Sequence, residues 1–151
     1  MKKIICTPLK YKEGYKYIQA EYLFVCETDI FPEQDIATKF ISLTTDGVLT
    51  TQPYFATDGA SGPTIDDKTN RRGAWAHDAL YELMRQGLLD IRWRYKCDEL
   101  LRDLSLQDAK EKHPNLYPFF YVRYNLWFKM VEWKAKKYAT KKGENPVLTA
   151  P

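Results

Sequence analysis

The first third of the chain alternates apolar and polar positions with the period of two that is typical of β-strands. Residues 15–27 are rich in Tyr, Phe, Val and Ile and keep part of this alternation, so they predict an extended strand. Two further runs of the same type, 39–44 and 48–51, are separated by Thr45-Asp46-Gly47. Asp-Gly between two such runs predicts a tight hairpin, because both residues tolerate positive φ. Residues 54–56 have the composition of one more short strand.

The pattern changes at a polar segment that covers residues 57–72. Two glycines and a proline fall within residues 57–63, which excludes the interior of a helix. We therefore expect a long loop here. Long loops inside compact domains often carry function, so this one is a place to look for a site.

Three helices are expected after the loop, over about 72–86, 91–110 and 117–137. The first stops at Gly87, a residue that suits the left-handed conformation closing many helices. The second carries apolar residues at i, i+3, i+4 and i+7, and it ends before Pro114. The third is apolar on several faces. We interpret its aromatic residues as core and helix-packing residues rather than as a base-stacking surface.

These elements predict a single α+β domain in which an N-terminal antiparallel β-hairpin or meander packs against about three C-terminal helices. The domain spans residues 1–142, with a β-rich part at 1–56, a motif loop at 57–72 and a helical part at 73–142. Residues 143–151 are expected to form a flexible tail. A length of 151 residues allows one such core and is short for two, and 44% hydrophobic residues exclude a disordered chain.

The net charge of +3 is too small to indicate nucleic-acid binding by itself, and we consider nucleic acid an improbable partner. The positive charge gathers near the end of the third helix. Cations there complement the helix dipole, so a solvated last turn is the first interpretation and a surface for an anionic partner is the second. The lysines concerned are Lys134, Lys136, Lys137, Lys141 and Lys142.

Cysteine usage and the start of the chain bear on the compartment. The three cysteines, Cys6, Cys26 and Cys97, are far apart and form no Cys-x-x-Cys pair, so neither a disulfide framework nor an ordinary zinc site is expected. This usage fits a reducing compartment. The apolar run Ile4-Ile5-Cys6 is shorter than the roughly 7–15 residues of a secretory signal. No segment approaches the ~20 apolar residues that span a bilayer, so we expect no membrane span.

One group of polar residues could support chemistry. His77, Asp78 and Tyr81 stand near the start of the first helix, and Asp98 stands in the second. Tyr81 follows His77 and Asp78 by one helical turn, so the three can meet on one side of the helix. The short connection predicts antiparallel helices. Counting back from the turn places residues near 98 opposite residues near 79, so Asp98 can face His77.

A histidine beside a carboxylate is a recognised catalytic device, because the carboxylate selects the tautomer and stabilises the imidazolium. His77 is thus a candidate general base for water, with Asp98 and Tyr81 as its orienting partners. Asp78 could hold a hard divalent cation together with oxygens of the loop, where Asp58, Gly59 and Ser61 are the nearest candidates. The identity of such a cofactor stays open, with calcium and zinc as the two possibilities.

Two motifs occur in order along the chain: Thr57-Asp58-Gly59-Ala60-Ser61-x-Pro63, then Ala76-His77-Asp78-x-Leu80-Tyr81, with Asp98 after them. Over about residues 40–135 the chain resembles the domain of unknown function 1353 family, small proteins of tailed bacteriophages and prophages. Gly62 departs from the bulkier residue usual there, and Cys97 departs from the usual Ala before the Asp. Neither change removes a polar group. The resemblance implies a phage-encoded protein and supplies no established activity.

The site also resembles the catalytic helices of phospholipase A2, where a His-Asp-x-x-Tyr helix packs antiparallel to a helix with another Asp and a Gly-rich loop helps to bind calcium. This likeness implies that His77 is the base, Asp78 the calcium ligand, and Tyr81 and Asp98 the orienting network. The disulfides and the Cys/Gly loop pattern of that family are absent. The likeness therefore concerns a site and not descent.

Other interpretations remain open for the same residues. Ser61 could be a nucleophile with His77 and Asp58 or Asp98, although Gly-x-Ser-x-Gly is missing. Asp58 and Ser61 could instead only hold their own turn. His77, Tyr81 and Asp98 could form a buried network that specifies helix packing, or the group could bind a ligand without turnover.

From these observations we expect a small phage or prophage protein with a hydrolase-like centre acting on an ester or amide. It would be made in the host bacterial cytoplasm and placed in a virion, a tail or a host-takeover assembly, with other phage structural proteins as partners. The competing class is a non-enzymatic structural or interaction protein of the phage particle, in which the His/Asp/Tyr network only stabilises the fold.

Overall fold

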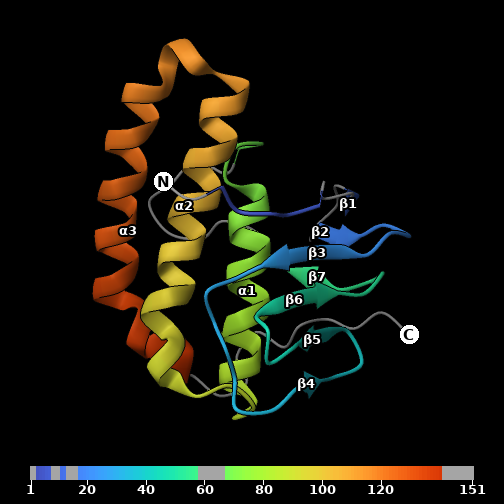
Figure 1. Ribbon diagram of the computed structural model, residues 1–151. Helices are drawn as coiled ribbons and strands as arrows, with labels where there is room; N and C mark the ends of the chain where they lie inside the picture. Colours follow the sequence, from blue (N-terminus) through green and yellow to red (C-terminus); the bar gives the residue numbers. More distant parts are fainter. Residues whose placement is uncertain (1–2, 8–10, 13–16, 58–66, 141–151) are drawn as a thin grey trace.

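The computed structural model describes residues 3–7, 11–12, 17–57 and 67–140, and its architecture is α+β, as predicted. Short antiparallel strands form the N-terminal part, and three helices follow them (Figure 1). Most of the motif loop and the expected tail at 143–151 lie outside the described residues. None of the described helices is long and apolar enough to cross a membrane.

The described strands form two antiparallel sheets. One has three strands in the order β1-β2-β7, and the other has four in the order β3-β6-β5-β4. The strands are β1 Tyr11–Lys12, β2 Tyr17–Gln19, β3 Phe24–Glu27, β4 Ile36–Ala37, β5 Ile41–Leu43, β6 Val48–Thr51 and β7 Ala56–Thr57.

The single strand predicted over 15–27 is wrong in one respect, because the chain leaves one sheet and enters the other within this range. β2 ends at Gln19 and β3 begins at Phe24 in the second sheet. Gln19 is buried, and its Nε2 donates to the carbonyl oxygens of Tyr22 at 2.7 Å and Thr51 at 2.8 Å. A buried amide that needs these acceptors fixes the bend, which composition alone does not reveal.

The predicted hairpin between β5 and β6 is present. Of its two turn residues, Gly47 alone adopts a positive φ, of 81°. The amide of Gly47 donates to the Thr44 carbonyl at 2.9 Å, and the Gly47 carbonyl accepts from the Thr28 amide at 2.8 Å. A Cβ at Gly47 would lie 2.7 Å from the Thr28 carbonyl oxygen. Glycine is therefore required here both by the backbone angle and by the close approach of a neighbouring segment.

The three helices follow the predicted ranges closely: α1 Arg71–Arg85, α2 Arg94–Lys112 and α3 Tyr117–Thr140. The start of the predicted second helix is a 3-10 turn, Ile91–Trp93, capped by the Asp90 side chain. The third helix likewise begins with a short 3-10 turn, Pro114–Leu116. Gly87 has φ 72° and its amide donates to the Met84 carbonyl at 2.9 Å, so it closes α1 as predicted.

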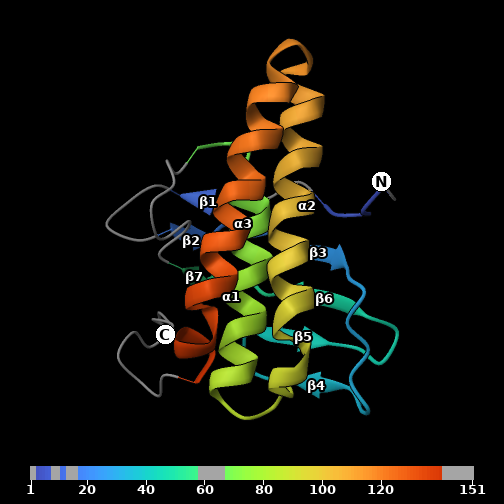
Figure 2. The same cartoon turned by 90° about the vertical axis from the view of Figure 1, so that its left-hand side faces the viewer.

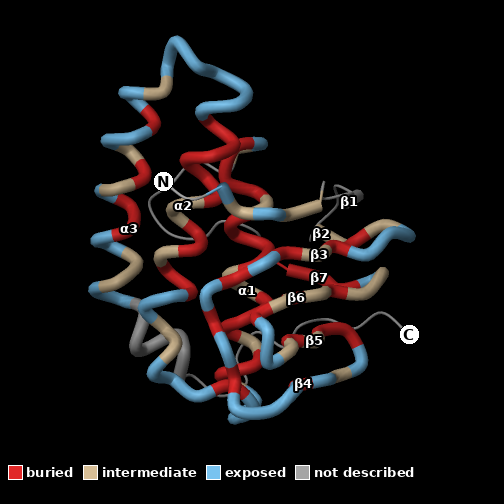
Figure 3. The backbone as a smooth tube through the Cα atoms, viewed as in Figure 1, coloured by how far each residue is buried: buried red, intermediate tan, exposed pale blue. Residues whose placement is uncertain are grey.

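The elements stack in layers. α1 lies against the strands, and α2 and α3 cover its other side (Figure 1, Figure 2). Figure 3 shows that burial concentrates where α1 meets the strands and where the helices face one another. Trp75 and Phe55 are among the largest core residues between α1 and the strands. The Trp75 indole donates to Thr51 Oγ1 at 3.2 Å, and the Phe55 ring meets the Trp75 ring edge to face.

The contact between α1 and α2 is close at one point. A Cβ at Gly73 would lie 2.7 Å from the Leu101 carbonyl oxygen and 3.0 Å from Ser105 Oγ. The two helix backbones therefore approach one another where α1 has no side chain. This approach sets the separation of α1 and α2, and with it the spacing of any residues that meet between them.

Candidate functional site

His77 and Asp98 meet between α1 and α2, as the antiparallel arrangement predicts. His77 Nε2 lies 2.9 Å from Asp98 Oδ1. The hydroxyl of Tyr81, one turn along α1, donates to the same oxygen at 2.6 Å. Helix periodicity brings His77 and Tyr81 to one face, and the short connection after Gly87 turns α2 back so that Asp98 faces them.

Asp98 is fully buried, and its carboxylate has partners on both oxygens. Its Oδ2 accepts from Arg94 Nη1 at 3.3 Å, and the same nitrogen donates to the Glu132 carbonyl of α3 at 3.3 Å. A buried carboxylate is tolerated only when it is paired and hydrogen-bonded, and here three side chains meet that need. Sequence reasoning missed Arg94, although its position four residues before Asp98 on one helix is a signal for such a pair.

The other nitrogen of His77 points toward Asp78. Nδ1 lies 3.6 Å from Asp78 Oδ1, which is beyond hydrogen-bond range, and no described residue makes a direct hydrogen bond to Nδ1. The imidazole stacks on the Tyr81 ring with centroids 4.0 Å apart and 30° between the planes. The side chain of His77 keeps 13% of its surface exposed. The imidazole is thus held at its Nε2 edge by Asp98 and on one face by Tyr81. Its Nδ1 edge lies beside the Asp78 carboxylate, whose side chain is 29% exposed.

The pKa of His77 is raised above its ordinary value. Burial is the largest single influence and would lower it, but the hydrogen bond to Asp98 and the negative charges of Asp98 and Asp78 together outweigh burial. Burial also raises the pKa of Tyr81, and the Asp98 charge adds to this effect. Tyr81 therefore stays a neutral donor to Asp98. In the neutral ring, Nε2–H donates to Asp98 and Nδ1 becomes the acceptor.

Asp78 links the helix to the end of β7. One of its oxygens, Oδ2, accepts a hydrogen bond from the hydroxyl of Thr57, which is the last residue of β7 and the first residue of the motif loop predicted at 57–72. The two sequence motifs therefore meet at this contact. The loop residues predicted to lie near the site are outside the described residues; they are Asp58, Gly59 and Ser61. The alternative in which Ser61 is a nucleophile therefore stays a prediction.

The described residues do not form a ligand set for a divalent metal. No group of three or more His, Cys, Asp or Glu side chains in the described ranges is placed to hold an ion. Asp78 supplies one carboxylate, whose oxygens already face Thr57 and His77. Calcium prefers six to eight oxygens and zinc four ligands, so neither fits these side chains alone.

A second polar network, missed by sequence reasoning, fixes the segment that leads from the loop into α1. Arg123 Nη1 of α3 donates to Asp67 Oδ2 at 2.8 Å. The hydroxyl of Thr69 is hydrogen-bonded to the hydroxyl of Tyr124, which also belongs to α3. Burial would raise the pKa of Asp67, but hydrogen bonds from Thr69 and Arg123 outweigh it and lower the pKa. The segment before His77 is therefore anchored to α3.

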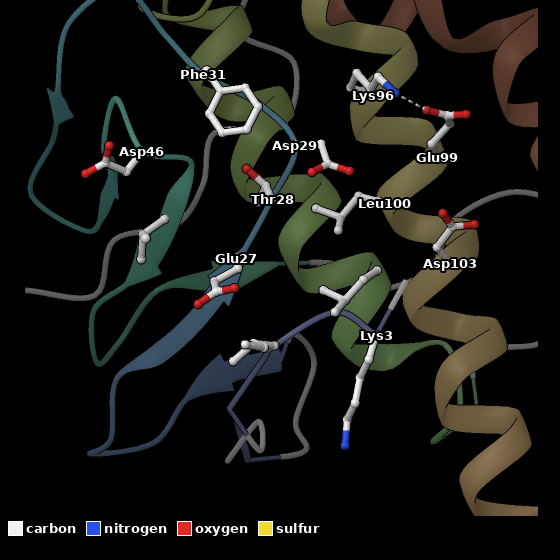
Figure 4. Close-up of a pocket in the computed structure, with 13 residues that line it drawn as sticks. Lys3, Glu27, Thr28, Asp29, Phe31, Asp46, Lys96, Glu99, Leu100 and Asp103 are labelled. Carbon is white, nitrogen blue, oxygen red and sulfur yellow. Dashed lines mark hydrogen bonds and ion pairs between the residues drawn. The ribbon is translucent and has the colours of Figure 1, made fainter. Parts of the chain in front are cut away.

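A hollow of about 410 Å³ lies elsewhere, between the N-terminal segment, the chain after β3 and α2 (Figure 4). Neither His77 nor Asp98 lines it. Its lining holds no histidine or thiol, and one of its carboxylates, Glu99, is paired with Lys96 at 2.9 Å. The other acidic side chains of its lining are Glu27, Asp29, Asp46 and Asp103. The hollow therefore lacks the histidine–carboxylate pair that marks His77 and Asp98 as the catalytic candidate.

Comparison with models of protein families, with curated protein sequences and with solved structures gives no match.

Proposed function

We propose that the chain is a hydrolase-like protein in which His77 acts as a general base on water, against an ester or amide carbonyl. One observation carries the proposal: Asp98 Oδ1 accepts from both His77 Nε2 at 2.9 Å and Tyr81 at 2.6 Å. A carboxylate held in this way selects the Nε2–H tautomer and leaves Nδ1 as the basic atom. Nδ1 is also the nitrogen without a direct hydrogen bond in the described part of the chain.

In the proposed reaction, Nδ1 takes a proton from water while the water oxygen bonds to the carbonyl carbon and the carbonyl π pair moves onto its oxygen, giving a tetrahedral oxyanion. The imidazolium so formed is stabilised by the buried Asp98 carboxylate, and Arg94 and Tyr81 keep that carboxylate in place. The oxyanion then re-forms the carbonyl double bond, the bond to the leaving oxygen or nitrogen breaks, and the proton on Nδ1 passes to that leaving atom. Tyr81 and Asp98 are positioning residues, since they touch His77 or its partner and not the reacting atoms.

We also propose that the protein is encoded by a phage or prophage, is made in the bacterial cytoplasm and joins a virion or tail assembly. The support is the order of the two motifs and their resemblance to the domain of unknown function 1353 family. The contact between Thr57 of the first motif and Asp78 of the second gives a physical reason for both to occur together.

A non-enzymatic structural or interaction protein is the alternative, and one observation favours it. The contacts of His77, Tyr81 and Arg94 satisfy a carboxylate that is fully buried, and His77 itself is only 13% exposed. A network with these properties can serve solely to specify how α1 packs on α2.

Hydrolysis of chromogenic short-chain esters and anilides by the full chain distinguishes the hydrolase proposal from the structural alternative. The chain has two histidines, so His77→Gln can be compared with His113→Gln, a matched control at the exposed end of α2. General-base catalysis is worth about 10²–10⁴-fold. We expect His77→Gln to lose that factor with its circular dichroism unchanged, and His113→Gln to keep the parent rate. A rate equal to buffer in the parent, or an equal rate in His77→Gln, supports the structural alternative.

A further inference from the structure

α3 is apolar on two opposite sides. Its inner side packs on α1 and α2 through buried Phe120, Tyr124, Trp127 and Phe128. Its outer side carries five exposed apolar residues, Phe119, Val122, Leu126, Met130 and Trp133, called here the outer stripe. At about 100° per residue, all five lie within about 40° of the direction of Leu126. Figure 2 shows α3 as the front element of this face of the molecule.

The outer stripe is large for a surface that stays in water. Phe119, Leu126 and Trp133 are 66%, 58% and 82% exposed. A fully covered aromatic side chain buries about 150–250 Å², so the five residues together offer on the order of 600 Å². That is at the upper end of the largest apolar patch on typical monomers, about 300–600 Å², and near the ~800 Å² per partner of a standard interface.

The spacing of the stripe is symmetrical about Leu126. Val122 and Met130 lie four residues to either side of it, and Phe119 and Trp133 lie seven residues to either side. A two-fold axis through Leu126 of an antiparallel helix pair therefore sets Phe119 against Trp133 and Val122 against Met130 of the other copy. Self-complementarity of this kind is what an interface between identical chains requires.

The charges next to the stripe favour the antiparallel arrangement. Lys129 and Lys134 are exposed in the C-terminal half of α3. In a parallel pair each lysine would lie beside its own copy. In an antiparallel pair centred on Leu126, the two Lys134 residues are about 24 Å apart along the helix axis, beyond the screening length of about 8–10 Å in physiological salt, and the two Lys129 residues are about 9 Å apart along it. The helix dipoles also oppose one another in this arrangement.

We infer that the outer stripe of α3 is the contact surface of a homodimer, in which two α3 helices pack antiparallel about a two-fold axis at Leu126. This inference is independent of the proposed hydrolytic site, since the stripe faces away from the α1–α2 interface that holds His77.

Sedimentation equilibrium of the full chain across micromolar concentrations tests the inference. The parent should be a dimer, and Leu126→Glu should weaken dimerisation on the order of 100-fold or more, because two like charges would meet at the axis. Leu88→Glu is the matched control, since Leu88 is exposed in the turn after α1 and off the stripe. It should remain dimeric, and circular dichroism should show both variants folded.

Disulfide trapping tests the orientation and does not depend on the behaviour of the Glu variant. Under mild oxidation, Leu126→Cys should form covalent dimers, and a mixture of Phe119→Cys with Trp133→Cys should form the mixed dimer. Phe119→Cys alone, and the parent with its three cysteines, should not. A parent that stays monomeric, a Leu126→Glu variant that dimerises like the parent, or trapping of Phe119→Cys with itself would overturn the inference. A monomeric parent that binds a different protein through the outer stripe would also overturn the inference.

Discussion

His77 Nε2 and Asp98 Oδ1 lie 2.9 Å apart, although the two residues are separated by 21 positions and belong to different helices. This hydrogen bond joins α1 to α2, and the Tyr81 hydroxyl of α1 donates a second hydrogen bond to the same Asp98 oxygen. Because Asp98 is fully buried, its charge must be balanced locally, and each partner that is removed leaves the others less satisfied. The stability and the chemistry of the site therefore respond to the same few atoms.

Asp98→Asn should destabilise the protein. Asn keeps the shape of the side chain but removes the charge that Arg94 and His77 face, so we expect a loss of about 1–3 kcal/mol in the free energy of unfolding. Arg94 keeps part of its surface in water, which moderates the cost. Urea denaturation measures it, with Asp103→Asn as the control on the same helix, where a partly exposed pair with Arg102 predicts less than about 1 kcal/mol. Equal costs for the two substitutions would contradict the assigned burial of Asp98.

The stability supplied by His77 should depend on pH. Its pKa is raised in the folded protein, so its contribution is complete below the ordinary value of about 6.5 and is lost as pH rises through the folded value. The difference in unfolding free energy between the parent and His77→Gln should therefore be larger at pH about 5.5 than at pH about 9. His113→Gln should keep the pH dependence of the parent. If His77 is the base, hydrolysis should change in the opposite sense and increase with pH, because the neutral ring accepts the proton.

Gly73→Ala should be destabilising in spite of helix propensity. At Gly73, in the first turn of α1, alanine would gain at most about 1 kcal/mol from propensity alone. The added Cβ would lie 2.7 Å from the Leu101 carbonyl oxygen, so the two helices must separate, and we expect a net loss of about 1–3 kcal/mol. Thermal denaturation gives the sign directly. A Tm above that of the parent would show that α1 and α2 do not approach as closely as described.

Several features could be predicted because their cause is local. The hairpin at Gly47, the closure of α1 at Gly87 and the three helical ranges each follow from short-range periodicity and backbone preference. The meeting of His77 with Asp98 also followed, since a short connection between two helices leaves little choice of register. The role of these residues in hydrolysis stays a proposal.

Other features depend on contacts between distant parts of the chain. Residues 15–27 divide between two sheets because the buried amide of Gln19 needs carbonyl oxygens of Tyr22 and Thr51. The bond from Thr57 to Asp78 joins a strand to a helix across the loop. The outward direction of one apolar side of α3 could not be predicted, since a helix that is apolar on two sides gives no sign of which side the core takes.

The sequence by itself determined the α+β class, the succession of a β-rich part and three helices, and the group of residues His77, Asp78, Tyr81 and Asp98, because these depend on periodicity over a few turns or strands. The tertiary structure alone decided three further points: the burial of Asp98, the added ion pair with Arg94, and the side of α3 that remains exposed. The physical reason is that burial and partner choice are set by which surfaces exclude water together, and this is a property of the packed chain rather than of any segment within it.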